Sequence, residues 1–416
     1  MLFEKMKDNI LLKKSFDTSN FSGVEMKKFL QKKIMLKHLY IEKALSTPEI
    51  SRITNLSAPT VISLLNELIK EQIVIEKGTG NSSGGRKPNL FGLNAEQILF
   101  LAIDIRNHYT RITIFDVNNA PVSEIRKVDV RLANKIEVMD LIVEEANKLI
   151  EQSGINKECL ISVGVSFPGL VDSEKGINYT YFDIKGGIRA YLEAKFDRPV
   201  EIENDARIRA LGELKFGLAK GLQNVLVIDV DWGIGLGMIL NGKLYRGNSG
   251  FAGEFSHINI VEEGLLCACG KRGCLETVAS AGALTELAKE ELRQGKLSLL
   301  NEMAGNDINA INSELIIQAA IDGDQFAIGL FDKVGKKLGK GIASLVHLYN
   351  PEKIIIGGKL SRVNDYLIAP IYQMLNKFCI SKVREDVVIE VSTLNENSGI
   401  IGAAAFVMDS IFNAEN

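Results

Sequence analysis

The pattern of apolar and polar positions predicts a set of helices near the start of the chain. A helix is predicted from Lys32, in the run QKKIMLKHLYIEKAL. Ser46 or Thr47 then caps a short helix, because serine and threonine oxygens accept a hydrogen bond from the first free N–H groups. Ser57 caps a further helix, whose apolar residues recur with helical spacing and bury one face: Val61, Leu64, Leu65 and Leu68. Residues 1–25 lack clean periodicity and are predicted to form an arm.

A strand–loop–strand pattern follows these helices. IVIEKGTGNSSGGRKPNLFGL has two short strand-like runs around a basic loop rich in Gly and Ser. Helix, short helix, helix and two-stranded wing is the order of a winged helix-turn-helix domain, predicted over residues 26–95. The candidate DNA contacts are Ser57, Ala58, Thr60, Ser63 and Asn66 in the helix and Gly85, Arg86 and Lys87 in the loop. The alternative is a helical cap or a protein-binding domain.

After Asn94 the pattern is that of an α/β protein. LFLAIDI and RITIFDV are predicted strands, and NVLVIDVDWGIGLGMILNGKLYRG repeats the strand–turn–strand plan about 125 residues later. This repeat predicts two similar lobes facing a cleft within residues 96–416. The first lobe covers about 96–205 with the C-terminal helix, and the second covers about 206–400. A long helix is expected to begin after a capping Asp324.

Composition and charge narrow the class of protein. Of the 416 residues, 46% are apolar and 24% are charged, as in ordinary globular proteins. No apolar run approaches the ~20 residues of a membrane span, and the charged N-terminus does not resemble a signal peptide. We therefore expect a cytoplasmic protein. Residues 1–90 carry 15 Lys and Arg against 9 Asp and Glu, whereas the rest carries 34 against 43, which suggests an anionic partner for the first segment.

Three of the five cysteines lie in one short stretch, GEFSHINIVEEGLLCACGKRGCLE. His257, Cys267, Cys269 and Cys274 supply four nitrogen and sulfur ligands, the composition of a closed tetrahedral zinc site. The alternative is a chance cluster of reduced, inert thiols. In a cytoplasmic protein a metal site is the better interpretation.

The glycine-rich turn GIGLG has two interpretations. A strand follows it, whereas a dinucleotide-binding fingerprint requires a helix. Its glycines, Gly233, Gly235 and Gly237, could still bring backbone N–H groups close to a phosphate. They could equally serve a tight hairpin that needs glycine for steric reasons.

The cysteine-rich stretch resembles the signature of the ROK family, which contains bacterial sugar kinases and sugar-responsive transcriptional repressors. SFPGLVD, IENDA, DWGIGLG, IIIGG and GIIGAAAF also resemble family stretches, and LSAPTV and SSGGRKP resemble the winged helix and the wing of the repressor branch. The resemblance covers the chain from about residue 30 to the end. It implies an actin-like fold of two ribonuclease-H-like lobes.

The resemblance also implies residue roles. The implied sugar contacts are Asn204, Asp205, Glu254, His257 and Glu276, and Asp205 matches the general base of the kinases. His257 would bind zinc through one ring nitrogen and the sugar through the other. The implied nucleotide contacts are Gly233, Gly235, Gly237, Gly357 and Gly358.

Two departures from the kinases decide between the repressor and kinase branches of the family. The first phosphate turn of the kinases is rich in glycine, whereas this chain has Arg106, Asn107, His108 and Tyr109 there, and Trp232 stands in the second turn. We therefore expect a repressor that binds double-stranded operator DNA as a homodimer or homotetramer and senses a sugar or sugar derivative. The alternatives are an ATP-dependent sugar kinase with an attached winged helix, and a body that responds to a partner protein.

Overall fold

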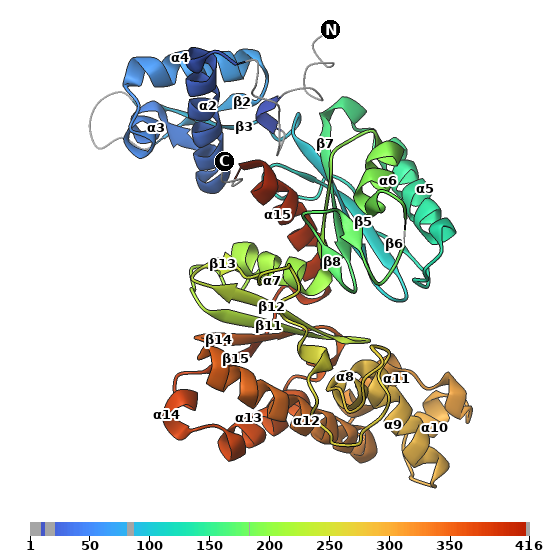
Figure 1. Ribbon diagram of the computed structural model, residues 1–416. Helices are drawn as coiled ribbons and strands as arrows, with labels where there is room; N and C mark the ends of the chain where they lie inside the picture. The colour runs from blue at the N-terminus through green and yellow to red at the C-terminus, as the bar shows by residue number, and fades with distance from the viewer. Residues whose placement is uncertain (1–9, 13–20, 81–86, 183, 413–416) are drawn as a thin grey trace. The chain divides into compact units, whose positions relative to one another are not determined.

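The computed structural model describes residues 10–12, 21–80, 87–182 and 184–412 (Figure 1). Two compact units can be distinguished, and each is described by itself. The first contains Met1–Glu203 and Ala403–Asn416, and the second contains Asn204–Gly402. Among the described residues, no helix has both the length and the apolar character needed to cross a bilayer.

The first unit opens with a helical segment and a small sheet. Its elements are η1 (Ile10–Leu12), α2 (Gly23–Glu42), β1 (Leu45–Ser46), α3 (Thr47–Thr54), α4 (Ala58–Lys70), β2 (Val74–Thr79) and β3 (Asn89–Leu93). The strands pair antiparallel in the order β1-β3-β2. The order of α2, α3, α4, β2 and β3 is the one that the sequence pattern predicted, whereas the short strand β1, which makes the sheet three-stranded, was not predicted. The loop residues 81–86 between β2 and β3 lie outside the described residues.

The caps explain where these helices begin. Ser46 precedes α3 and Ser57 precedes α4, as predicted. The start of α2 was predicted wrongly, because the helix begins at Gly23 and not at Lys32. Its start is set by a capping box. The Ser22 N–H donates to Glu25 Oε2 at 2.9 Å, and the Glu25 N–H donates to Ser22 Oγ at 3.3 Å.

A five-stranded mixed sheet follows in the same unit, in the order β10-β7-β4-β5-β6. Strand β4 pairs antiparallel with β5 and parallel with β7. Met139, Ile142, Ala146 and Leu149 lie on one face of α5 and pack in the core of this sheet. The elements are β4 (Leu99–Ile105), β5 (Thr110–Asp116), β6 (Arg126–Val128), α5 (Ile136–Gln152), β7 (Leu160–Phe167), β8 (Val171–Asp172), β9 (Ile177–Asn178), α6 (Gly187–Phe196) and β10 (Val200–Asn204).

The last helix, α15 (Ser398–Phe412), joins this sheet to the N-terminal segment. The Phe412 ring stacks on that of Tyr40 in α2, with 5.5 Å between centroids. Lys33 Nζ donates a hydrogen bond to the carbonyl oxygen of Ile411 at 2.8 Å. One apolar core contains residues of α2, α4, β4, β7 and α15, among them Leu36, Leu65, Phe100, Ile161 and Met408. The N-terminal helices are therefore packed on the first sheet.

The second unit contains another five-stranded sheet, in the order β13-β12-β11-β14-β15. Strand β11 again pairs antiparallel with one neighbour and parallel with the other. The two sheets thus share one plan, as the repeated sequence unit predicted. The strands are β11 (Val225–Val230), β12 (Ile234–Leu240), β13 (Lys243–Leu244), β14 (Lys353–Gly357) and β15 (Val388–Val391).

Helices cover both faces of the second sheet (Figure 1). Leu226 and Ile228 pack with the long helix α12 and with α13, whereas Val225 and Val227 pack beside Ala210 of α7, because successive strand residues face opposite sides. Asp324 caps α12, as predicted. The helices are α7 (Asp205–Phe216), α8 (Glu276–Ala279), α9 (Ala281–Arg293), α10 (Leu300–Met303), α11 (Ser313–Ile321), α12 (Gln325–Tyr349), α13 (Asp365–Phe378) and α14 (Ser381–Arg384).

Candidate functional site

One loop of the second unit brings four possible metal ligands together. One ligand atom from each of His257, Cys267, Cys269 and Cys274 lies within 4.8 Å of all the others. Cys267 Sγ is 3.6 Å from His257 Nδ1, and Cys269 Sγ is 3.6 Å from Cys274 Sγ. A tetrahedral zinc ion with Zn–S bonds of about 2.3 Å separates its sulfur ligands by about 3.8 Å. The three thiols are not joined in a disulfide, so the donor set and its spacing fit a zinc ion.

The loop backbone depends on a glycine, and the thiols favour a bound cation. A Cβ at Gly273 would lie 1.9 Å from the carbonyl oxygen of Val261, so only glycine allows the loop to close. Burial raises the pKa of the Cys274 thiol to about 12, and the neighbouring Cys269 and Cys267 thiols raise that pKa as well. Metal binding requires thiolates, and a cation removes the cost of placing them side by side.

The geometry at His257 assigns its two ring nitrogens. Nδ1 faces the cysteine sulfurs, whereas Nε2 lies 3.9 Å from Glu254 Oε2. Burial raises the pKa of the Glu254 carboxyl, the charges of His257 and Arg207 lower it, and those of Asp205 and Glu276 raise it. These charges act on Glu254 because the loop and the start of α7 lie close together.

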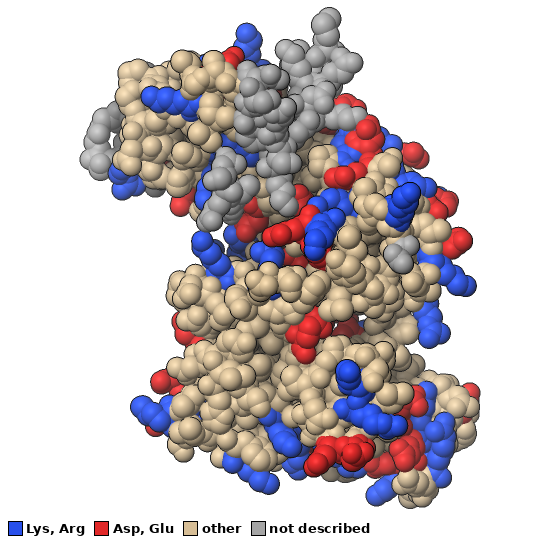
Figure 2. Space-filling model, in the orientation of Figure 1, with Lys and Arg blue, Asp and Glu red and all other residues tan. Residues whose placement is uncertain are grey.

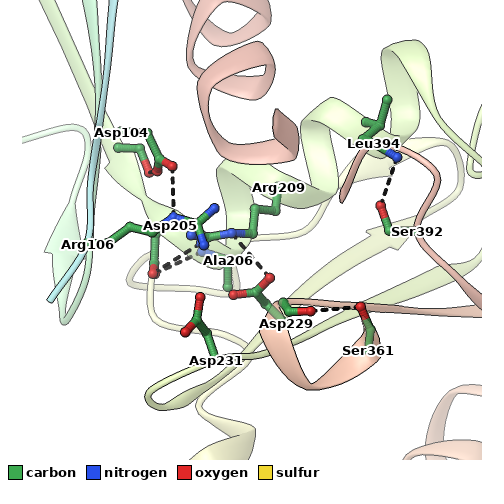
Figure 3. Close-up of polar contacts among 12 residues, drawn as sticks. Asp104, Arg106, Asp205, Ala206, Arg209, Asp229, Asp231, Ser361, Ser392 and Leu394 are labelled. Atoms are coloured by element: carbon green, nitrogen blue, oxygen red, sulfur yellow. Dashed lines mark hydrogen bonds and ion pairs between the residues drawn. The ribbon is translucent and has the colours of Figure 1, made fainter. Parts of the chain in front are cut away.

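The N-terminus of α7 positions two further predicted sugar contacts, Asn204 and Asp205. Asn204 caps the helix, its Oδ1 accepting hydrogen bonds from the backbone N–H groups of Ala206 and Arg207 at 3.0 and 3.2 Å. Asp205 Oδ2 lies 3.2 Å from Arg209 Nη1, and Arg209 Nε lies 3.3 Å from Asp229 Oδ1 (Figure 3). The buried guanidinium thus fixes the Asp205 carboxylate from one turn further along the helix.

All five predicted sugar contacts therefore belong to the second unit. The structure places Asp205, Glu254, His257 and Glu276 where their charges interact, and Asn204 precedes Asp205 in the chain. That they bind a sugar stays a prediction. Arg207 and Arg209 were not predicted. The spacing of four residues between Asp205 and Arg209 on a helix was the signal that could have found the second of them.

Steric packing in this fold explains Gly235, Gly237 and Gly358 among the predicted nucleotide-binding glycines. A Cβ at Gly235 would lie 2.7 Å from Ala206 Cβ, and a Cβ at Gly237 would lie 2.4 Å from Ala210 Cβ, so both glycines let β12 approach α7. A Cβ at Gly233 would meet Glu276 Oε2 at 2.6 Å. Gly358 has a φ of +80° and packs on the backbone of Val230, and Gly357 precedes it at the end of β14. Nucleotide binding by these glycines stays a prediction.

The turn that corresponds to the first phosphate turn of the kinases is held by hydrogen bonds of Arg106, all within the first unit. The Arg106 backbone N–H donates to the carbonyl oxygen of Tyr109 at 2.9 Å, which closes the turn. Arg106 Nε donates to Asp104 Oδ2 at 3.0 Å (Figure 3), and Ser166 Oγ donates to Asp104 Oδ1 at 3.0 Å. The guanidinium therefore neutralises the buried Asp104 carboxylate, and the Arg106 side chain is itself buried beside it.

The predicted DNA-contacting helix, α4, has a buried and an exposed face. Val61, Leu64, Leu65 and Leu68 are buried, as predicted. Ala58, Ser63 and Asn66 are exposed, whereas Thr60 is half-buried and interacts with Ser57 Oγ through its hydroxyl at 2.8 Å. Lys87 is exposed, and Gly85 and Arg86 lie outside the described residues.

The fold and the site together define an α/β protein with a repeated mixed sheet, a Cys₃His loop and an N-terminal helical segment. The model of the ROK family matches residues 100–410. The chain belongs to the ROK family.

Relatives matched over most of the chain are named as regulators. The xylose repressor of Caldicellulosiruptor bescii is 30% identical, over 93% of this chain and 97% of the relative. A crystal structure of a ROK family transcriptional regulator, a homolog of the E. coli Mlc protein, has a TM-score of 0.77 and 26% identity, over 92% of this chain and 97% of that one. A ROK family glucokinase from Streptomyces griseus, solved with glucose and AMPPNP, has a TM-score of 0.66 and 28% identity. It covers only 74% of this chain, and 98% of its own.

Proposed function

We propose that this protein is a transcriptional repressor that binds operator DNA through its N-terminal segment and senses a sugar through its second unit. The observation that carries the proposal is the match to a repressor along more than nine-tenths of both chains, N-terminal segment included. We propose that it acts in the cytoplasm, as a homodimer or homotetramer, because paired operator half-sites mirror a two-fold axis.

The N-terminal segment supports the DNA-binding half of the proposal. α4 has a row of small and polar exposed residues opposite its buried leucines, which suits insertion into a major groove. Lys and Arg side chains occur on the visible face of this segment, at the upper left of Figure 2. The basic loop between β2 and β3 would then follow the DNA backbone.

The carboxylates of the second unit support the sugar-sensing half. Asp205, Glu254 and Glu276 offer acceptor oxygens, which suit the hydroxyl groups of a carbohydrate. A zinc ion bound by the Cys₃His loop would hold the ring of His257 in one orientation and leave Nε2 for the ligand. The metal's contribution is structural, and recognition depends on the chain's own polar groups.

Phosphoryl transfer is the weaker alternative. Catalysis of that reaction depends on turns that surround the phosphates, and here Arg106 fills the first turn with its own ion pair. About a quarter of this chain also has no counterpart in the matched kinase. We expect no turnover when the protein is incubated with ATP, magnesium and a hexose and pentose panel.

Helix α15 provides a route for the sugar signal, because it contributes residues to both units. In the second unit α7, which begins with Asp205, packs closely on its first turns: a Cβ at Gly212 would lie 2.7 Å from the Ser398 carbonyl oxygen. In the first unit its last turn stacks Phe412 on Tyr40. A ligand that shifts α7 would thereby act on the N-terminal helices through a chain of packed residues.

Selection of duplexes from a random DNA pool tests the proposal with the full-length protein. Fluorescence anisotropy on the selected duplex should show that Asn66→Ala weakens binding about tenfold, since a base contact is worth ~1–3 kcal/mol. Lys87→Ala should weaken selected and scrambled duplexes alike, because a phosphate contact carries no sequence information. Asn309→Ala, at an exposed asparagine of the second unit, is the matched control. Failure to enrich any duplex would contradict DNA binding.

A further inference from the structure

The turn between β11 and β12 presents the single tryptophan of the chain. Trp232 is 47% exposed, although the turn itself is well fixed. The Asp231 N–H donates to the Gly233 carbonyl oxygen at 3.0 Å, and the Trp232 N–H donates to Asp231 Oδ1 at 2.8 Å. A large aromatic side chain is thus held half exposed on a rigid backbone.

The same turn caps helix α9. The N–H groups of Ala281 and Gly282 donate to the carbonyl oxygens of Asp231 and Trp232 at 2.9 and 3.4 Å. The next N–H, that of Ala283, donates to Ser280 Oγ at 3.1 Å. Helix N-termini bind phosphate through such N–H groups, and here the protein's own oxygens already accept their hydrogen bonds. The start of α9 therefore does not serve as a phosphate site.

The indole lies over this first turn of α9. Its Cε2 atom is 3.8 Å from the position that a Cβ of Gly282 would take, which is ordinary van der Waals contact. The ring therefore lies close to the start of α9, although Trp232 remains half exposed.

The turn is also joined to the carboxylate cluster. The Ile234 N–H donates to Glu276 Oε2 at 3.4 Å, and Gly233 packs against the same oxygen. On the other side of the turn, Asp229 in β11 lies 3.3 Å from the Arg209 guanidinium that holds Asp205. Trp232 therefore lies between β12, which contacts Glu276 directly, and β11, which is linked to Asp205 through Arg209.

We propose that Trp232 contacts the effector: its indole face packs on the C–H face of a sugar ring whose hydroxyl groups bind Asp205, Glu254 and Glu276, and the site prefers an unphosphorylated sugar. This inference rests on the proposed function. An aromatic ring offers an apolar surface with a negative face, which suits the C–H groups of a sugar and repels a phosphate. Three nearby carboxylates add like-charge repulsion against a sugar phosphate, and α9 offers no compensating N–H groups.

Tryptophan emission gives a direct test, since the chain has only one such residue. Full-length zinc-loaded protein is titrated with D-xylose, D-glucose and N-acetyl-D-glucosamine, and with xylose 5-phosphate, glucose 6-phosphate and N-acetylglucosamine 6-phosphate. One neutral sugar should shift the emission with the same Kd that calorimetry gives. Its phosphate should bind at least tenfold more weakly.

Two substitutions distinguish a direct contact between Trp232 and the sugar from a structural role of the side chain. By calorimetry, Trp232→Ala should raise the Kd for that sugar about tenfold or more, and Trp232→Phe, which keeps an aromatic face, should remain within threefold of the parent protein. Metal content and the cooperativity of thermal unfolding serve as controls for folding in both variants. A merely structural role would alter unfolding in the alanine variant without a selective loss of sugar affinity.

The outcomes distinguish the inference from the proposed function. The proposed contact would be overturned if a sugar binds without shifting the tryptophan emission. It would also be overturned if Trp232→Ala binds the sugar with the Kd of the parent protein. Tighter binding of a sugar phosphate would overturn the preference, while the sugar-sensing proposal would stand. Calorimetry that finds no binding of any of the six compounds would overturn both.

Discussion

Cys269 is the exposed member of the three clustered cysteines, and its sulfur lies 3.6 Å from that of Cys274. Serine keeps the shape of the side chain but is a poor zinc ligand, so Cys269→Ser should lose bound zinc. Loop order depends on the metal, and sugar affinity should fall with it. Elemental analysis of the purified variants measures the metal. Cys379→Ser, at a half-buried cysteine elsewhere in the second unit, should retain it.

An unchanged zinc content in Cys269→Ser would contradict the ligand assignment. Loss of zinc in both variants would point to unfolding as the cause. In that case the Cys267 and Cys274 sulfurs, both buried, would have to be tested one at a time.

Single side chains also show what the sequence could and could not reveal. The cluster of His257, Cys267, Cys269 and Cys274 is predictable because its members lie in one short stretch of the chain. Arg209 follows Asp205 by four residues in α7, a local signal that was overlooked, whereas its second partner, Asp229, comes from β11 and meets it only through folding. The capping role of Trp232 on α9 was hidden for the same reason.

Helix α15 packs closely on the backbone of α7. A Cβ at Gly402 would lie 2.1 Å from the carbonyl oxygen of Ile208 in α7, and backbone cannot move as a flexible side chain does. Gly402→Ala should therefore reduce the free energy of unfolding by about 1–3 kcal/mol or more. Chemical denaturation followed by circular dichroism measures the change.

Gly329→Ala is the matched control for that substitution. Gly329 lies within α12. A Cβ at this position would have no described atom within 4 Å, apart from the neighbouring backbone of its own helix. Alanine should therefore stabilise the helix by ~0.5–1 kcal/mol. Equal effects of the two substitutions would show that the α7–α15 contact carries no special stability.

Elements with local signals were predicted well. Strand β4 spans Leu99–Ile105, the apolar run identified in the sequence, and α4 begins directly after its predicted cap Ser57. The start of α2 was missed because its residues before Lys32 are mostly exposed, so no apolar period marks them. Only the serine and glutamate of its capping box indicate that start.

For the whole molecule, the repeated strand–turn–strand unit was enough to predict two sheets of one plan. The packing of α15 on the N-terminal helices could not be predicted, because Tyr40 and Phe412 are far apart in the chain and meet through tertiary contact alone. The N-terminal segment shares one apolar core with the first sheet and α15, and the proposed coupling between sugar and DNA depends on this packing.

The coupling of sugar to operator affinity is the most direct test of this account. The Kd for the selected duplex is measured by anisotropy with and without saturating sugar, beginning with D-xylose, at fixed salt concentration. We predict that the sugar raises this Kd at least tenfold, and that operator DNA raises the Kd for the sugar by the same factor, because linkage is reciprocal. A sugar that binds the protein without changing its operator affinity would contradict the account.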